Sequence, residues 1–269
     1  MDLAPARPPA TPEAGDFATL LRQRGLYPQL SSGAASVGNT VPAEQTQATT
    51  ILAFKFADGV LVAGDRRATA GNTVVYDRAD KVLEIDSHSL MAIAGVPATA
   101  WEMARVLEHS FQFYRRSQLQ EMSLEGKVRA LSKLLRDNLG MVLQGVGVVV
   151  PIFAAYDAVA GVPRLYFYDA MGAQFEVTDF AATGSGSPAV RGVLYYENTW
   201  GKKPLTKCRQ TEAIIIALRA LDTAAETDTA TGGVDRRGRV YPIIKIISSK
   251  GIHTLAEKDL ARVFKREVP

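Results

Sequence analysis

The order of apolar patterns along this 269-residue chain predicts an α+β fold of four layers, in which two β-sheets pack face to face between helices. Three observations support this fold class. A strand hairpin opens the patterned part of the chain at residues 49–63. Two amphipathic helices follow between residues 98 and 144, and strands and then helices fill the rest. A sandwich with helices on both outer faces covers the apolar side of every such element.

Residues 1–48 differ in composition from the rest of the chain. They contain six of the 13 prolines and are otherwise rich in Ala, Gly, Ser and Thr. Such a segment buries too little apolar surface to offset its ordering entropy, so we expect it to be disordered or partly helical. Phe17, Leu20 and Leu21 form one apolar island at helical spacing. Two interpretations stay open: the island docks on a partner surface, or it is a sticky patch in a disordered tail.

The hairpin at the start of the folded part has the clearest strand signal. Residues 49–57 and 60–63 are apolar runs, and Asp58-Gly59 between them is a strong two-residue turn signal. Further strands are expected at residues 74–76, 82–85, 89–94, 146–156, 164–169, 174–177 and 240–247.

Helical periodicity predicts the outer layers. The first long helix, at residues 98–117, has an apolar stripe that includes Leu107 and Phe111. A second helix follows at residues 124–144. Further helices are expected at residues 188–196, 207–227 and 255–266.

Charge and composition narrow the range of partners. Hydrophobic residues make up 47% of the chain and charged residues 22%, as in ordinary globular proteins. The net charge of +3 is too balanced to favour nucleic acid or a membrane surface, so neither partner is expected. A basic cluster at residues 236–239 lacks interleaved aromatics and is interpreted as a solvated loop. The longest apolar run, residues 146–156, contains Pro151 and is too short to span a bilayer.

Cysteine and histidine usage argues against several kinds of site. The single cysteine, Cys208, forbids an internal disulfide or a multi-cysteine metal site and is interpreted as structural. His88, His109 and His253 are not at metal-binding spacing, so neither a metal nor a cofactor is expected. The N-terminus has no visible targeting segment, and the cytoplasm is the expected location.

Thr49, at the boundary between the two parts of the chain, is the candidate nucleophile. A threonine hydroxyl needs an adjacent base, and no histidine lies near Thr49 in sequence. A free α-amino group, with a reference pKa of about 7.7–8.0, accepts a proton near neutral pH. Thr49 gains such a group only if the Ala48–Thr49 bond is cleaved. Residues 1–48 are therefore interpreted as a propeptide, and residues 49–269 as the catalytic domain of a peptidase made as an inactive precursor.

Five other residues are candidates to support this nucleophile. Lys81 would place an ammonium beside the hydroxyl, and Asp65 would hold that ammonium. Gly95 would bring an amide close to a developing oxyanion, because no β-carbon intervenes. Ser185 would hydrogen-bond the new amine, and Asp228 would complete a polar network on the other side. Each residue alone has an ordinary structural explanation, so the argument depends on their order and spacing together.

Taken together, these motifs resemble those of the catalytic β subunit of the proteasome, from residue 49 to about residue 247. The Arg66-Arg67 pair and the long tail look most like actinobacterial proteasomes. The motifs that carry the resemblance are Thr49-Thr50-Ile51, Gly64-Asp65-Arg66-Arg67-Ala68-Thr69, Lys81, Ala94-Gly95, Gly184-Ser185-Gly186-Ser187 and Asp228-Thr229-Ala230-Thr231-Gly232-Gly233.

The resemblance implies a fold, an activity and an assembly. The fold is the αββα sandwich of N-terminal-nucleophile hydrolases. The activity is that of a threonine endopeptidase that hydrolyses unfolded proteins inside a barrel-shaped particle. The implied partners are a homo-heptameric β ring stacked on a second β ring, proteasome α subunits, a ring-shaped ATPase regulator and protein substrates tagged with a ubiquitin-like modifier.

The resemblance also assigns roles to single residues. Thr49 would be the nucleophile and, through its amine, the base, with Asp65 and Lys81 as its charge partners. Gly95 would supply the oxyanion amide, and Ser185, Asp228 and Thr231 would support the amine. Substrate backbone would bind at Thr69, and the pocket for the residue before the cut would be formed by Ala68, Ala79, Leu83, Ile93, Pro97 and Trp101.

This sequence departs from the family pattern at two positions. Ala48 stands where many relatives have Gly, and its smaller backbone freedom predicts slower self-cleavage. Thr231 stands where many relatives have Ser, which keeps the hydroxyl. Three other interpretations compete with this one: a bacterial HslV-type protease, a non-peptidase N-terminal-nucleophile amidase, and a catalytically silent structural ring subunit.

Overall fold

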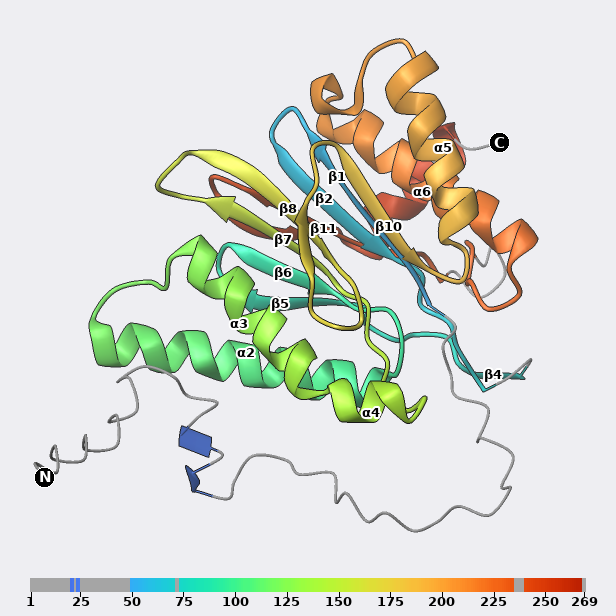
Figure 1. Ribbon diagram of the computed structural model, residues 1–269. Coiled ribbons are helices and arrows are strands. Elements are labelled where there is room, and N and C mark those ends of the chain that lie inside the picture. Colours follow the sequence, from blue (N-terminus) through green and yellow to red (C-terminus); the bar gives the residue numbers. More distant parts are fainter. Residues whose placement is uncertain (1–19, 22, 25–48, 71–72, 235–239, 268–269) are drawn as a thin grey trace, which may run out of the picture.

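The computed structural model describes residues 20–21, 23–24, 49–70, 73–234 and 240–267. Figure 1 shows two packed β-sheets with helices over both outer faces, the predicted four-layer arrangement. The first sheet has the strand order β10-β1-β2-β11-β12 and every neighbouring pair is antiparallel. Its strands are β1 (Thr50–Phe56), β2 (Gly59–Gly64), β10 (Phe180–Gly184), β11 (Ile243–Ser248) and β12 (Gly251–Thr254).

The second sheet is also antiparallel throughout, in the order β5-β6-β7-β8-β9. A separate short hairpin connects the two sheets along the chain. The strands of the second sheet are β5 (Val82–Asp86), β6 (Ser89–Ala92), β7 (Ile152–Asp157), β8 (Val162–Tyr168) and β9 (Gln174–Glu176), and those of the hairpin are β3 (Ala68–Ala70) and β4 (Thr73–Tyr76).

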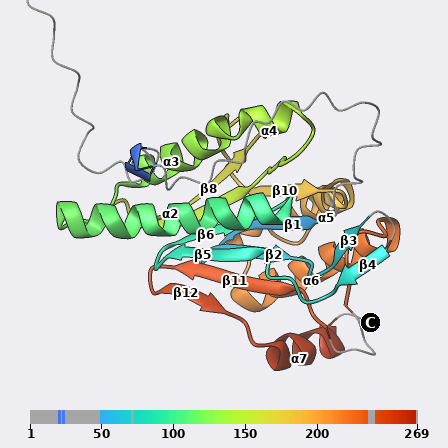
Figure 2. The same ribbon diagram turned by 90° about the horizontal axis from the view of Figure 1, so that it is seen from below.

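Helices cover the outer face of each sheet. The second sheet is covered by α2 (Pro97–Gln118) and α3 (Leu124–Asp137), which lie side by side in Figure 2, and the short α4 (Leu139–Leu143) follows α3. On the first sheet lie α5 (Ser187–Trp200), α6 (Gln210–Thr227) and α7 (Glu257–Glu267), with the one-turn helix η1 (Leu205–Lys207) between α5 and α6. No described helix is long and apolar enough to cross a membrane.

Three layers of apolar side chains fill the spaces between these elements, and strand alternation sorts residues among them. Along β1, Leu52 and Phe54 face the helices α5 and α6. Ile51 and Ala53 face the other sheet instead. The same alternation places Thr50 on the helix side of β1 and Thr49 on the side of the second sheet. This difference decides what each of the two threonines can contact.

Most expected elements are confirmed, with shifted ends where the backbone is interrupted. The hairpin forms as predicted, with Phe56 opposite Gly59. The helix expected at residues 124–144 breaks at Asn138, whose side chain donates to the Gly147 carbonyl instead of continuing a helical face. The strand expected from residue 146 begins only at Ile152, because Pro151 has no N–H to pair.

Other differences have local reasons. The last long strand begins at Ile243 rather than residue 240, directly after Pro242. Two edge strands, β10 and β12, were not expected from their short and weakly alternating sequences. Cys208 is buried, and burial raises the pKa of its thiol, as fits a structural residue.

Some expectations fall on parts of the chain that the structure does not describe. The basic cluster at residues 236–239, Phe17 and nearly all of the propeptide expected at residues 1–48 lie outside the described residues. Within that segment, Leu20 and Leu21 are helical and half-buried.

Candidate functional site

Thr49 lies immediately before β1, where backbone contacts hold the chain on both sides of it. Its carbonyl accepts a hydrogen bond from the Ser185 N–H at 3.1 Å, and the next N–H, that of Thr50, donates to Asp65 Oδ1 at 2.8 Å. Gly184 passes very close, since a β-carbon there would lie 1.6 Å from the Thr49 carbonyl oxygen. Its φ of +99° also favours glycine, so both the close approach and the backbone conformation require glycine at position 184. Thr49 is thus buried and fixed in place by β10 and β2.

Asp65 follows the last residue of β2 and is the most completely satisfied polar group of the site. Its Oδ1 accepts from the Thr50 N–H at 2.8 Å and from Lys81 Nζ at 2.7 Å. Its Oδ2 accepts from the N–H groups of Arg67 and Gly232 at 2.9 and 3.0 Å. The side chain has no exposed surface. Four donors therefore hold both oxygens of this carboxylate in place.

Lys81, just before β5, directs its ammonium toward Asp65. Nζ also donates to the Arg67 carbonyl at 2.5 Å, and the residue is buried. Burial lowers the pKa of Lys81 below that of a free lysine, while the charge and hydrogen bond of Asp65 oppose the shift. The arrangement therefore places a buried, oriented lysine on the wall of one small pocket together with Thr49.

Asp228, directly after α6, is the centre of a second polar network. Its Oδ2 accepts from Ser185 Oγ at 2.6 Å and from Thr231 Oγ1 at 2.5 Å. Burial alone would raise the pKa of Asp228, but these two hydroxyls, the Ala230 N–H and the charge of Lys81 outweigh it and hold the pKa below its ordinary value. The carboxylate is thus ionised at neutral pH, with hydroxyl groups pointing at it.

A small apolar pocket opens beside Thr49, with a volume of about 130 Å³. Thr49, Lys81 and Gly95 lie on its wall together with five of the seven residues expected to contact substrate: Ala68, Ala79, Ile93, Pro97 and Trp101. Tyr76 also lines it and was not anticipated.

The other two residues expected to bind substrate lie elsewhere. Leu83 is not among the residues that line the pocket; it packs against the core beneath α2. Thr69 is buried in β3, and its hydroxyl has no hydrogen-bond partner within the described part of the chain.

Gly95 occupies its place on the pocket wall because no other residue fits there. Its φ is +114°, and a β-carbon would lie 2.0 Å from the Val148 carbonyl oxygen. It forms an isolated bridge with Val149, which ties the end of β6 to the segment before β7.

Four residues of the site were missed as participants by sequence reasoning. Thr50 bonds to both networks, Gly186 donates its N–H to Thr50 Oγ1, and Gly232 donates to Asp65. Arg67 donates from Nη1 to the carbonyls of Thr229 and Thr231, which fastens the loop after α6 to the end of β2. Strand alternation is the one sequence signal that could have separated the role of Thr50 from that of Thr49.

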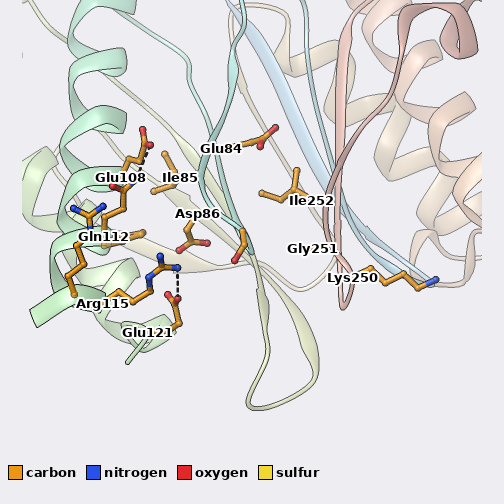
Figure 3. Close-up of a pocket in the computed structure, with 13 residues that line it drawn as sticks. Glu84, Ile85, Asp86, Glu108, Gln112, Arg115, Glu121, Lys250, Gly251 and Ile252 are labelled. Atoms are coloured by element: carbon orange, nitrogen blue, oxygen red, sulfur yellow. Dashed lines mark hydrogen bonds and ion pairs between the residues drawn. The ribbon is translucent and has the colours of Figure 1, made fainter. Parts of the chain in front are cut away.

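A larger cleft, of about 650 Å³, lies at the other end of α2 and β5 (Figure 3). Its charged side chains largely compensate one another: Arg115 is 3.4 Å from Glu121, and Asp86 is paired with Lys127. Trp101 at the small pocket and Arg115 at this cleft are separated by 14 residues of α2, about 20 Å of helix. Size alone would favour this cleft, but the nucleophile and its charge partners are at the small pocket.

The described residues contain no cluster of His, Cys, Asp and Glu that could hold a metal ion.

Comparisons with known proteins agree with this fold. A family model described as "Proteasome subunit" matches residues 45–237. The beta 2 proteasome subunit of Thermomonospora curvata is 41% identical over 215 residues, which is 80% of this chain and 74% of that protein. The beta subunits of Jonesia denitrificans and Streptosporangium roseum are 39% and 38% identical, over 87% and 84% of this chain and 76% and 77% of their own lengths.

The sandwich of two sheets between helices, with a threonine at the start of its first strand, is the N-terminal-nucleophile hydrolase fold. The chain belongs to the proteasome subunit family, and the relatives named above are β subunits. Membership of the β-subunit branch implies peptidase activity and assembly with other proteasome subunits in a particle.

Proposed function

We propose that this chain is a catalytic proteasome β subunit, a threonine endopeptidase whose nucleophile is Thr49. The observation that carries the proposal is that Thr49 shares one pocket wall with Lys81 and Gly95, while Asp65 holds the lysine ammonium at 2.7 Å. A silent subunit has no need for a desolvated cation beside a pocket. Burying such a pair is costly unless geometry and hydrogen bonds compensate.

The reaction follows from these positions. The Thr49 hydroxyl attacks the carbonyl carbon of the scissile bond, and its proton passes to the free Thr49 amine. The Gly95 N–H stabilises the oxyanion, and the Lys81 charge favours the developing alkoxide. The C–N bond then breaks as the leaving amine takes the proton. Water hydrolyses the resulting ester on Thr49 and restores the enzyme.

The Asp228 network supports the amine in this scheme. Ser185 and Thr231 both donate to the carboxylate, so their lone pairs remain to accept hydrogen bonds from the amine. Thr231 in place of the more usual Ser keeps this bond to Asp228, so the substitution is compatible with the role.

Activation would require cleavage after Ala48, which frees the Thr49 amine. Residues 1–48 are then a propeptide that silences the enzyme. We further propose a cytoplasmic particle of two stacked homo-heptameric β rings between α rings, with a ring-shaped ATPase that delivers unfolded proteins carrying a ubiquitin-like tag.

Thr49→Ala tests the nucleophile directly. The full chain is co-expressed with a proteasome α subunit, and intact mass and hydrolysis of fluorogenic peptides are measured on the assembled particle. The variant should retain residues 1–48 and lose turnover, whereas Thr183→Ala, which changes a buried threonine of β10, should be processed and active. Thr49→Ser should keep part of the activity, since it retains the hydroxyl but loses the methyl that restricts χ1. Normal turnover by an assembled Thr49→Ala particle would refute the proposal.

The pocket beside Thr49 predicts specificity. Among the described residues that line it, Lys81 alone is charged, and Asp65 already engages that lysine, so a charged substrate side chain would be desolvated without a partner. We expect faster cleavage after Leu, Phe or Tyr than after Asp or Arg. A peptide panel with the reverse order would show that another surface binds this side chain.

The propeptide is proposed to affect assembly as well as activity, because an apolar island on a tail can engage a neighbouring subunit. Replacement of Phe17, Leu20 and Leu21 by Ser should change the rate of particle formation, followed by native mass measurement. Activity per assembled particle should be unaffected. Equal assembly rates and yields for this variant and the natural chain would leave only the silencing role.

A further inference from the structure

Thr50, the residue after the proposed nucleophile, bonds to both polar networks of the site. Its N–H donates to Asp65 Oδ1 at 2.8 Å, and its Oγ1 lies 2.5 Å from Thr231 Oγ1. Its side chain points to the helix side of β1 and has no exposed surface. Arg67 also joins the two networks, through its N–H to Asp65 and its Nη1 to the Thr231 carbonyl, but Thr50 does so with a hydroxyl that contacts the Thr231 hydroxyl.

The direction of each hydrogen bond in this chain of hydroxyls follows from counting protons. The ionised carboxylate of Asp228 can only accept hydrogen bonds, so the one hydroxyl proton of Thr231 is donated to Asp228. The oxygen of Thr231 must therefore accept from Thr50. Thr50 is free to donate because its own oxygen already accepts the Gly186 N–H at 2.9 Å. The order is Gly186 N–H to Thr50, Thr50 to Thr231, and Thr231 to Asp228.

Gly186 leaves room for this order of contacts. A β-carbon on Gly186 would lie 2.6 Å from both the Thr50 and the Thr231 hydroxyl oxygens. Gly186 is also the residue that precedes α5, so its N–H belongs to the positive end of that helix. A donor of this kind polarises the hydroxyls that follow it, since hydrogen bonds in a buried chain strengthen one another.

We propose that Thr50 is a positioning residue for the peptidase reaction, which orients the Thr231 hydroxyl toward Asp228 and so sets the proton affinity of the Thr49 amine. This inference rests on the proposed function. The charged groups that face the start of β1 are Asp65, Lys81, Arg67 and Asp228, and three of them contact one another directly. Asp65 accepts the Thr50 backbone N–H, which a side-chain change leaves in place, whereas Asp228 is linked through Thr231 to the Thr50 hydroxyl.

The loss of the Thr50 hydroxyl has a defined consequence. Thr231 would lose the donor that occupies one of its lone pairs, and its hydrogen bond to Asp228 would weaken. Both changes favour the protonated amine, because a freed lone pair and a less neutralised carboxylate each attract an ammonium. The acid limb of the pH profile of kcat/KM, which reports deprotonation of the amine, should move to higher pH.

The test compares Thr50→Val, which keeps the shape but removes the hydroxyl, with Thr50→Ser, which keeps the hydroxyl. Each full chain is co-expressed with an α subunit, and kcat is normalised to the processed β subunits counted by intact mass. We expect kcat to fall by about 10- to 100-fold in Thr50→Val, the range for leaving buried groups without a partner. KM should change little, and the acid limb of the pH profile should shift to higher pH. Thr50→Ser should restore both kcat and the pH profile. Thr183→Val, the matched change in neighbouring β10, should leave the pH profile unmoved.

Each outcome decides the question. A processed Thr50→Val enzyme with the wild-type kcat and pH profile, or a Thr50→Ser enzyme as impaired as Thr50→Val, would overturn the positioning role. A fall in melting temperature alone would do the same. If Thr50→Val does not assemble, Thr50→Cys, whose thiol is a weak donor, should assemble with an intermediate shift. If the processed natural chain is itself inactive, the proposed function fails and this inference fails with it, whereas an active natural chain with an unaffected Thr50→Val variant overturns this inference alone.

Discussion

Asp65 and Asp228 lie on opposite sides of the start of β1, and different kinds of groups hold them. Asp65 is fully buried and accepts from three backbone N–H groups and one lysine. Asp228 is half-buried and accepts from two side-chain hydroxyls and one backbone N–H. Backbone amides cannot turn, whereas hydroxyls can exchange donor and acceptor roles. The first carboxylate thus suits a fixed charge, and the second suits a place where a proton arrives and leaves.

This difference predicts that Asp65 matters to the fold and Asp228 to the pH dependence. The strongest test is Asp65→Asn. An amide would place its NH₂ group against two of the four donors, so we expect the free energy of unfolding to fall by about 3–5 kcal/mol, as when a buried pair is broken. Little particle should assemble, as measured by chemical denaturation and native mass.

Asp86→Asn is the control for that change. Asp86 also accepts from a backbone N–H and a hydroxyl and pairs with a lysine, but it lies at the far end of β5. A milder loss of stability is expected there, because only one backbone amide is involved. An Asp65→Asn chain as stable as the Asp86→Asn chain would show that the three backbone donors contribute little.

After Thr49→Ala, Lys81→Ala should have the largest effect on catalysis among variants that still assemble. Removal of one preorganised charge at a reacting oxygen costs about 100- to 1,000-fold in kcat. Peptide hydrolysis per processed subunit measures it.

Lys245 provides the matched control for Lys81. It is equally buried and pairs with Glu84 and Asp80, but it lies on β11 outside the pocket. Lys245→Ala should lower stability while kcat stays near the natural value. Equal rates in the two variants would mean that Lys81 is only a structural ion pair.

More of the contacts around Asp65 than of those around Asp228 could be predicted from the sequence, and the reason is physical. Asp65 and Lys81 lie at strand ends in one continuous stretch with Thr49, so their order and spacing carry information. The network around Asp228 joins residues far apart in the chain, such as Thr50 and Thr231, which are 181 positions apart. Pairing of β10 with β1 brings Ser185 to this place, and β10 itself was not expected. Leu83 was assigned to the pocket by resemblance to the family, but in this structure it packs beneath α2 and is not on the pocket wall.

Asp228→Asn should change the pH dependence more than the fold. The folded-state pKa of Asp228 lies below its ordinary value of 3.8. The ionised carboxylate therefore stabilises the native state above that value, and the contribution is lost as pH falls through the lower folded pKa. We expect a modest loss of stability at pH 7 that disappears in acid, and a kcat lower by about 10- to 100-fold, at least as large a fall as in Thr50→Val, because Thr50 acts through this carboxylate.

Asp169→Asn serves as its control, because Asp169 accepts from the Met171 and Ala173 N–H groups in a turn remote from the site. It should leave the pH profile of peptide hydrolysis unchanged. Melting temperatures of both variants from pH 3 to pH 8 would separate the two carboxylates. A stability difference that is constant across this range would contradict the ionic origin assigned to Asp228.

Ser185→Ala should give the smallest effect and sharpens the comparison most finely. Thr231 still donates to Asp228 when Ser185 is lost, and the Ser185 N–H still holds the Thr49 carbonyl, since that bond comes from the backbone. Only one of the two hydroxyls that donate to the carboxylate is removed. We therefore expect kcat to fall a few-fold, which corresponds to about the net free energy of one hydrogen bond. Ser132→Ala, which removes a buried hydroxyl bonded to Gln174, controls for stability alone.

Because Asp228 stays ionised with fewer donors, it should hold the Thr49 ammonium more strongly, and the acid limb of kcat/KM should move to higher pH. If Ser185→Ala instead abolished activity as completely as Thr49→Ala, the two hydroxyls would not share one task, and Ser185 would have a separate role in the proton transfer itself.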